Sequence, residues 1–262
     1  MRFDIITIFP EPFEAYFNES ILKRAREKKL IDIKIWNLRD FAKIDPKRAN
    51  DKFPPRRQID DRPFGGGPGM VMGVEPLARA LEVVLGNPVT KSITPLAHLT
   101  LSGAKKKKIL IILLDAGGKQ FDSKMAATFS KKYKHIIFIC GRYEGVDERI
   151  KNIVKAHGFR LMALSVGPYV LTGGELPAMI IIDAVARHTP GVLGKNESLE
   201  EKRYGVGVPV YTRPEVFKWP IRQPARQLAG GAQGKQKIYR VPKVLLSGNH
   251  KNIEEWRLKH KK

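Results

Sequence analysis

The chain has 262 residues, and 42% of them are hydrophobic, which excludes a wholly disordered or low-complexity protein. Its 48 lysines and arginines outnumber 26 acidic residues and give a net charge of +22. Such an excess predicts a polyanionic partner, most simply a nucleic acid; a merely basic surface is the alternative.

Cysteine content and hydropathy further restrict the class of protein to which the chain can belong. The single cysteine, Cys140, excludes an internal disulfide and a cysteine-based zinc site, and it fits a reducing compartment. The apolar stretches are far shorter than the ~18 residues that span a bilayer, and the N-terminus lacks the pattern of a signal peptide. We therefore expect a cytoplasmic protein without a membrane partner.

The first part of the chain alternates between two patterns. Short runs rich in Ile, Leu, Val and Phe predict buried strands of a parallel sheet over residues 3–9, 31–36, 109–114 and 136–140, with another strand over 166–171. Apolar residues at helical spacing predict helices over residues 13–28, 75–85 and 123–133, and over 175–187. Strands that alternate with helices predict an α/β fold. The helix over 175–187 is apolar nearly all round, which predicts either a subunit interface or an ordinary core helix.

The character of the sequence changes after Gly191. We expect a first domain over residues 1–191, a linker over 192–207 and a small, mainly helical, basic domain over 208–262. Residues 218–243 hold seven basic residues and no acidic ones, so they are interpreted as a flexible basic insertion.

Two glycine-rich segments fail the tests for common nucleotide sites. In residues 65–70, GGGPGM, methionine occupies the last glycine position of the dinucleotide-binding pattern, and no Gly-Lys-Ser/Thr follows. In residues 117–120, GGKQ, glutamine replaces the Ser/Thr of a P-loop. An ATPase or an ordinary NAD enzyme is therefore disfavoured.

Three glycine-bearing segments lie at the ends of predicted strands, at residues 113–118, 140–145 and 166–175. Ligands of open α/β sheets bind beyond the carboxyl ends of the strands, where glycine lets the backbone approach them closely. The three segments together predict one ligand pocket; the alternative for each is an ordinary tight turn.

Long motifs connect these segments with a known family. They are DDRPFGGGPGM (60–70), ICGRYEGVDERI (139–150), VGPYVLTGGELPAM (166–179), PGVLG (190–194), YTRPEVF (211–217) and VLLSGNH (244–250). Together they closely resemble the bacterial tRNA (guanine-37-N1)-methyltransferases of the TrmD type, in the right order over nearly the whole chain.

The resemblance implies a SPOUT-type parallel sheet with a deep trefoil knot, a homodimer with a shared active site, and S-adenosyl-L-methionine as the methyl donor. The residues implied for the donor are Leu113, Leu114, Gly118, Gly141, Tyr143, Glu144, Val166, Gly167, Pro168, Tyr169, Val170, Leu171, Gly173, Gly174 and Pro177. Those implied for the target guanine of the tRNA are Asp61, Arg62, Gly65 and Gly69. A magnesium requirement goes with the family; the sequence has no dedicated metal cluster, so we expect Mg²⁺ to act through RNA or through one or two carboxylates.

The resemblance also implies two catalytic groups. Arg187 matches the family's arginine that stabilises negative charge on guanine O6; a surface arginine near a helix C-terminus is the alternative. The general base of the family is a linker aspartate supplied across the dimer, but an ungapped alignment from Gly194 puts Lys202 there. A slip of one residue makes Glu201 the expected base, with Glu200 the next candidate and another base the remaining one.

Further departures leave other functions open. Pro168 stands where the family usually has aspartate, and Asp115 replaces a usual serine. The alternatives to the methyltransferase are a non-catalytic RNA-binding protein on the same scaffold and a SPOUT methyltransferase with a different RNA target.

Overall fold

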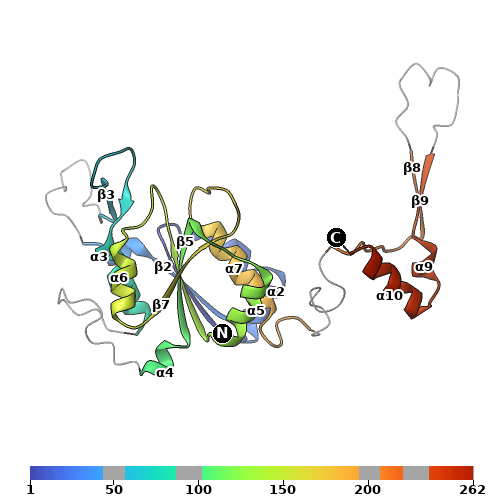
Figure 1. Ribbon diagram of the computed structural model, residues 1–262, viewed down its shortest axis with the longest axis horizontal. Helices are drawn as coiled ribbons and strands as arrows, with labels where there is room; N and C mark the ends of the chain where they lie inside the picture. The colour runs from blue at the N-terminus through green and yellow to red at the C-terminus, as the bar shows by residue number, and fades with distance from the viewer. Residues whose placement is uncertain (44–56, 87–101, 195–206, 221–235, 262) are drawn as a thin grey trace, which may run out of the picture. The chain divides into compact units, whose positions relative to one another are not determined.

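The computed structural model describes residues 1–43, 57–86, 102–194, 207–220 and 236–261 (Figure 1). The chain divides into two units, Met1–Lys195 and Asn196–Lys262. In the described part of the chain, no helix is long and apolar enough to cross a membrane.

A five-stranded parallel sheet forms the centre of the first unit. Its strands lie in the order β2 (Asp32–Asn37), β1 (Arg2–Thr7), β6 (His135–Cys140), β5 (Ile109–Gln120) and β7 (Arg160–Ser165). The four apolar runs predicted as strands up to residue 140 are confirmed as β1, β2, β5 and β6. The continuous apolar runs of β5 and β6 suit a parallel sheet that is covered on both faces. Asp4 interrupts β1, and β2 alternates charged and apolar residues.

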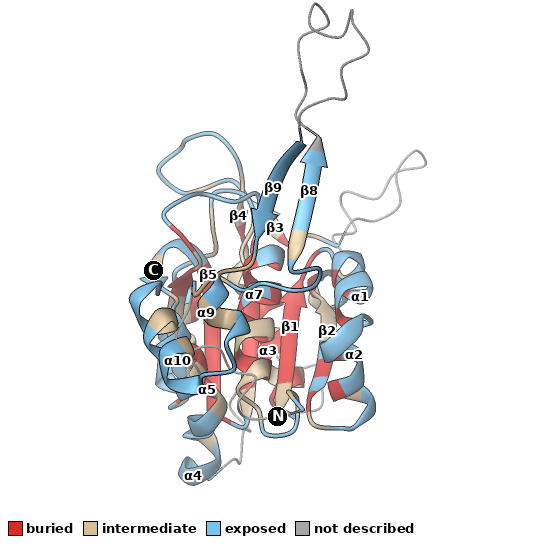
Figure 2. Cartoon of the chain, turned by 90° about the vertical axis from the view of Figure 1, so that its right-hand side faces the viewer, coloured by how far each residue is buried: buried red, intermediate tan, exposed pale blue. Residues whose placement is uncertain are grey.

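Helices cover both faces of the sheet, as Figure 1 shows. Alternate residues of β1 divide between the two cores: Phe3 and Ile5 join one cluster of buried side chains, and Ile6 joins the other. The first cluster includes residues of α1 (Glu11–Phe17), α2 (Ser20–Glu27), α5 (Ser123–Lys132) and α7 (Glu175–Arg187). The second includes residues of η1 (Leu38–Phe41), α3 (Val74–Val84) and α6 (Arg149–Ala156). Figure 2 shows β1 buried between these layers.

Two predicted elements differ from the structure. Residues 166–171 form a loop, because the strand ends at Ser165 and the apolar side chains that follow, such as Val170, face solvent. The helix predicted over 13–28 is two helices, α1 and α2, separated at Asn18 and Glu19, with Ser20 at a φ of +48°. The sequence reasoning also missed β7, α6, the short α4 (Gly103–Lys106), and the paired β3 (Asp60–Asp61) and β4 (Val71–Met72).

The second unit combines two strands with two helices. An antiparallel hairpin of β8 (Val216–Pro220) and β9 (Gln236–Arg240) precedes α9 (Lys243–Leu246) and α10 (His250–Lys259). The expectation of a mainly helical domain was therefore incomplete. Residues 218–220 and 236–240 of the predicted basic insertion belong to these paired strands, and the facing rings of Phe217 and Tyr239 stabilise the ladder.

Candidate functional site

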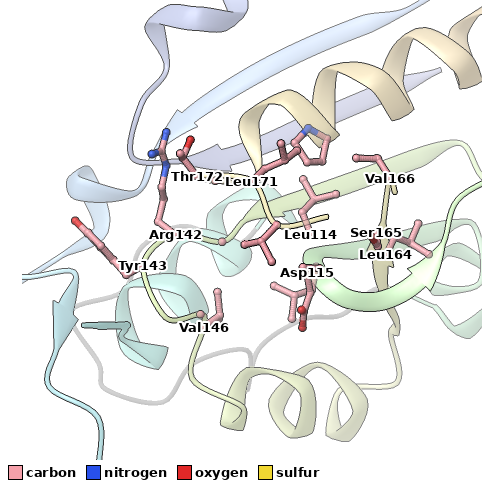
Figure 3. Close-up of a pocket in the computed structure, with 18 of the residues that line it drawn as sticks. Leu114, Asp115, Arg142, Tyr143, Val146, Leu164, Ser165, Val166, Leu171 and Thr172 are labelled. Carbon is pink, nitrogen blue, oxygen red and sulfur yellow. The ribbon is translucent and has the colours of Figure 1, made fainter. Parts of the chain in front are cut away.

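A pocket of about 350 Å³ lies where β5, β6 and β7 approach their carboxyl ends (Figure 3). Three segments line it: the β5 residues around Leu114, the loop after β6, and the loop between β7 and α7. This is the edge of a parallel sheet at which ligands of open α/β folds bind. Figure 3 shows side chains of all three segments, including Leu114, Val146 and Leu171, around one space.

The first segment is a bulge inside β5. Both Leu114 and Lys119 pair with Leu164 of β7, so residues 115–118 project from the ladder between them. Asp115 and Ala116 thereby line the pocket, while Gly118 lies against the β7 backbone. A Cβ atom on Gly118 would meet the carbonyl carbon of Ala163 at 2.6 Å, so this close approach requires glycine.

The second segment follows Cys140, at the end of β6. Tyr143 adopts a φ of +60°, a left-handed conformation that costs a non-glycine residue free energy and is enriched at functional sites. The amide of Gly174 donates a hydrogen bond to the carbonyl of Gly141 at 2.9 Å. A Cβ on Gly174 would meet Cys140 Cα at 2.6 Å, so the second and third segments touch through their backbones.

The third segment, residues 166–174, closes the pocket before α7 begins. The hydroxyl of Ser165 donates a hydrogen bond to the carbonyl of Gly167 at 2.8 Å and holds the turn at the start of the loop. Val170 is 85% exposed, and Tyr169 is 53% exposed. Large apolar side chains left open to solvent beside a pocket are typical of a binding surface.

A buried carboxylate fixes the second segment to the start of α7. Glu175, 4% exposed, accepts a hydrogen bond from the hydroxyl of Thr7 at 2.7 Å and another from Nε of Arg142 at 3.2 Å. The guanidinium of Arg142 also lies 4.5 Å from the ring centroid of Phe9. Because the charge of Glu175 is both paired and hydrogen-bonded, its burial is tolerated and the pocket wall is held in place.

The glycine-rich loop, residues 62–70 between β3 and β4, is joined to this wall. The amide of Glu144 donates to the carbonyl of Met70, and the amide of Met72 donates to that of Gly145, both at 3.0 Å. Gly69, at a φ of +82°, lies against the Glu144 side chain. Burial, followed by a hydrogen bond with Asp60, raises the pKa of Tyr143 above its ordinary value.

The charges around the pocket favour a ligand with positive charge and an apolar part. Asp115, Glu144 and Glu148 contribute carboxylates, against the single guanidinium of Arg142, which is already paired with Glu175. Leucine and valine side chains supply the apolar wall. Across the described ranges, no group of three or more His, Cys, Asp or Glu side chains is placed to hold a metal ion.

The structure brings together most of the residues expected to bind the donor. Those that line the pocket are Leu113, Leu114, Gly141, Tyr143, Glu144, Val166, Tyr169, Val170, Leu171, Gly173, Gly174 and Pro177. Gly118, Gly167 and Pro168 do not line it. Sequence reasoning did not name Ala116, Arg142, Gly145, Val146, Glu148, Leu164, Ser165 and Thr172 as donor residues, although several of them lie inside the motifs already singled out. It noted Asp115 in the first donor segment only as a departure from the family's serine.

The remaining expected residues lie elsewhere. Asp61 is in β3, and Arg62, Gly65 and Gly69 are exposed in the loop that follows. Arg187 is the last residue of α7, whereas the pocket contacts that helix near its first turn, at Pro177. The expected bases, Glu200 and Glu201, and the anomalous Lys202 lie outside the described residues.

Comparisons with known proteins agree with one another. A family model described as tRNA (Guanine-1)-methyltransferase TrmD matches residues 1–262. Three similar proteins are each named tRNA (guanine-N(1)-)-methyltransferase. That of Dictyoglomus turgidum is 42% identical over 262 residues, covering 99% of this chain and 84% of its own. That of Carboxydothermus hydrogenoformans is 41% identical, with coverages of 99% and 82%. That of Clostridioides difficile is 40% identical over 260 residues, with coverages of 98% and 90%.

Proposed function

The chain belongs to the TrmD family of tRNA (guanine-1)-methyltransferases, and on that premise we propose that S-adenosyl-L-methionine is its methyl donor and the guanine at position 37 of tRNA, next to the anticodon, its target. The observation that carries the proposal is the pocket formed by three segments at the carboxyl end of the sheet. Its volume of about 350 Å³ is in the range of small-molecule sites.

The chemistry of the lining fits the donor. When bound, the donor supplies an electrophilic methyl group on a positively charged sulfonium. The carboxylates of Asp115, Glu144 and Glu148 favour the positive charges of the sulfonium and the amino group. Leu114, Val146 and Leu171 offer an apolar wall to the adenine, and the backbone near Gly141 and Gly174 allows close approach.

The glycine-rich loop is proposed to receive the guanine. It is hydrogen-bonded to the loop that contains Tyr143 and Glu144, so a base bound against Gly65 or Gly69 would lie beside the donor pocket. Asp61 and Arg62 at the start of the loop present exposed polar groups to RNA.

The chemistry needs a base and an anion stabiliser. N1 of guanine is a poor nucleophile while it carries its proton, so a carboxylate must take that proton as N1 attacks the methyl carbon and the carbon–sulfur bond breaks. We assign this role to Glu201, with Glu200 as the second candidate. Arg187 is proposed to stabilise the negative charge that develops on guanine O6.

A homodimer with a shared site is part of the proposal. Within one chain Arg187 lies at the far end of α7 from the pocket. Arg187 and the donor pocket therefore act together only if the arginine of one copy meets the pocket of a second copy. On α7, Leu176 and Ile180 are 57% and 46% exposed and four residues apart, which makes an apolar strip suited to pairing with another copy. The deep trefoil knot of the SPOUT fold belongs to the same proposal.

The division of labour along the chain follows from the proposal. Residues 1–191 hold the donor site, residues 192–207 carry the base, and the basic residues 208–262 bind tRNA. Mg²⁺ would be held through RNA or by one or two carboxylates. Because its substrate is tRNA, we place the enzyme in the cytoplasm.

Two measurements test the proposal. Calorimetry with S-adenosyl-L-methionine should give one donor site per chain. Ala116→Trp, which fills the pocket from an exposed position, should abolish donor binding. Labelled methyl from the donor should then appear in a tRNA transcript. Donor binding without transfer to any tRNA would favour the non-catalytic RNA-binding protein, and an absence of donor binding would contradict the assignment of the pocket.

A further inference from the structure

The β8–β9 hairpin presents aromatic side chains on one face. Phe217 and Tyr239 are directly opposite each other in the ladder, and Trp219 is opposite Lys237. Residues two apart in a strand share a face, so all four side chains lie on the same side of the hairpin. The ring centroids of Phe217 and Trp219 are 5.5 Å apart, with an angle of 31° between the planes.

These rings are not buried by the protein. Trp219 is 57% exposed, and Phe217 and Tyr239 are 48% exposed each. Contact between the rings stabilises the hairpin, but it covers only about half of their surface. The rest of the aromatic surface is open to solvent.

Positive charge accompanies the aromatic face. The Nζ of Lys237 lies 5.3 Å from the ring centroid of Tyr239. Lys218 and Arg240 belong to the same two strands but alternate onto the opposite face, and neither strand contains an acidic residue. An apolar protein partner would not select such charge, whereas a polyanion with flat rings is complementary to both features.

We propose that the aromatic face of Phe217, Trp219 and Tyr239 stacks on unpaired bases of RNA while Lys237, on the same face, contacts its phosphates. The inference rests on the proposed function in taking RNA as the polyanion, and it extends that function by assigning base contact to this face. Proteins that bind single-stranded nucleic acid combine stacking rings with a basic surface in this way. An unpaired loop fits the face better than a duplex, whose bases are already stacked on one another.

The decisive experiment separates stacking from charge in the full-length protein. The probes are a short single-stranded RNA and an RNA duplex of the same length, each titrated at several salt concentrations without methyl donor. The wild type should prefer the single strand. Trp219→Leu should weaken its binding at least about fivefold, the loss expected for one stacked base, without changing the salt dependence. Lys237→Gln should instead lower the salt slope by about 0.7.

Two variants control for damage to the hairpin. Trp219→Phe keeps an aromatic ring and should retain most of the binding lost in Trp219→Leu. Ile238→Ala changes a side chain that is also 48% exposed but lies on the opposite face, and it should bind like the wild type. The proposal would be overturned if Trp219→Leu and Ile238→Ala lost equal affinity for the single strand. It would also be overturned if neither Trp219→Leu nor Trp219→Phe lost any affinity.

Other partners for this face give different results. Tryptophan-dependent binding to anionic lipid vesicles with none to RNA, or tryptophan-dependent self-association, would also overturn it. Failure of the proposed function is visible separately, because the binding assay contains no methyl donor. If both hold, Trp219→Leu should raise the KM for tRNA in methyl transfer and leave kcat unchanged.

Discussion

Pro177 and Arg187 lie near opposite ends of α7, one lining the pocket and the other closing the helix. Ten residues separate them, which corresponds to about 15 Å along the helix axis. No side-chain movement of Arg187 closes that distance to a ligand in the same pocket. If both residues serve one reaction, each site contains the pocket of one chain and the arginine of another.

This relationship predicts complementation between inactive variants. Arg187→Ala and Ala116→Trp should each abolish methyl transfer alone. In a mixed dimer one site combines the intact pocket of one chain with the intact arginine of the other, so co-refolding equal amounts should restore about a quarter of wild-type activity. Activity in mixtures of the refolded variants is the measurement, with each variant refolded alone as the control. No recovery, in dimers shown to have exchanged, would place both groups in one chain.

The assignment of the base predicts unequal effects for two adjacent glutamates. Glu201→Ala should lower turnover by about 10²-fold or more, a usual loss for a general base, while donor binding stays unchanged. Glu200→Ala, the matched control, should cost much less. Single-turnover methyl transfer at saturating tRNA and donor measures both. The assignment is wrong if Glu200→Ala abolishes turnover and Glu201→Ala leaves it unchanged.

Adjacent glycines in the β5 bulge predict a difference in stability. A Cβ on Gly118 would meet backbone atoms of β7 at 2.6 Å, whereas a Cβ on Gly117 would meet only the Asp115 side chain at 3.5 Å, an ordinary contact. Gly118→Ala should therefore lower the free energy of unfolding by about 1–3 kcal/mol, and Gly117→Ala should change it little. Denaturant titration of both variants checks this. Equal stabilities would mean that the bulge relaxes at no cost.

The buried Asp4 predicts how stability depends on pH. Burial raises the pKa of this carboxyl, but hydrogen bonds from His135, Arg2 and Trp36 outweigh that effect and hold the pKa below 3.8. Since the folded pKa is below the unfolded one, the stabilisation is complete above the unfolded pKa and is lost as the pH falls through the folded value.

Below about pH 4 the free energy of unfolding should therefore fall, and Asp4→Asn should be less stable than the wild type at pH 7 by an amount that shrinks as the pH falls. Thermal unfolding of both proteins between pH 3 and pH 7 measures the difference. A constant difference across this range would show that Asp4 is not responsible for the pH dependence.

Strands that are buried on both faces could be predicted from the sequence, whereas the partly exposed edge strand β7 could not. β6 and the first half of β5 are almost entirely apolar because helices cover both faces of the sheet, so composition alone identifies them. The edge strand β7 begins with Arg160 and is only partly buried, and it was missed. Val166 and Val170 were assigned to a strand because apolar composition does not distinguish a core strand from a loop that presents apolar side chains to a ligand.

The pocket could be predicted in outline because its segments follow recognisable strands. Its finer composition could not, since the bulge that turns Asp115 into the pocket depends on a register shift between β5 and β7 that no local pattern encodes. Nor does sequence spacing indicate that Glu175 pairs with Arg142, 33 residues earlier. The aromatic face of β8 and β9 could not be predicted either. Its residues are separated in sequence within and beside a basic segment, and their rings come together only when the two strands pair.

Methyl transfer to the guanine at position 37 can be tested with one pair of tRNA transcripts. Labelled S-adenosyl-L-methionine is supplied with a tRNA transcript that has guanine at positions 36 and 37, and with a second that differs only by adenine at position 37. The account predicts label in the first, recovered as 1-methylguanosine, and none in the second. Equal labelling of both transcripts, or of neither while the donor binds, would contradict it.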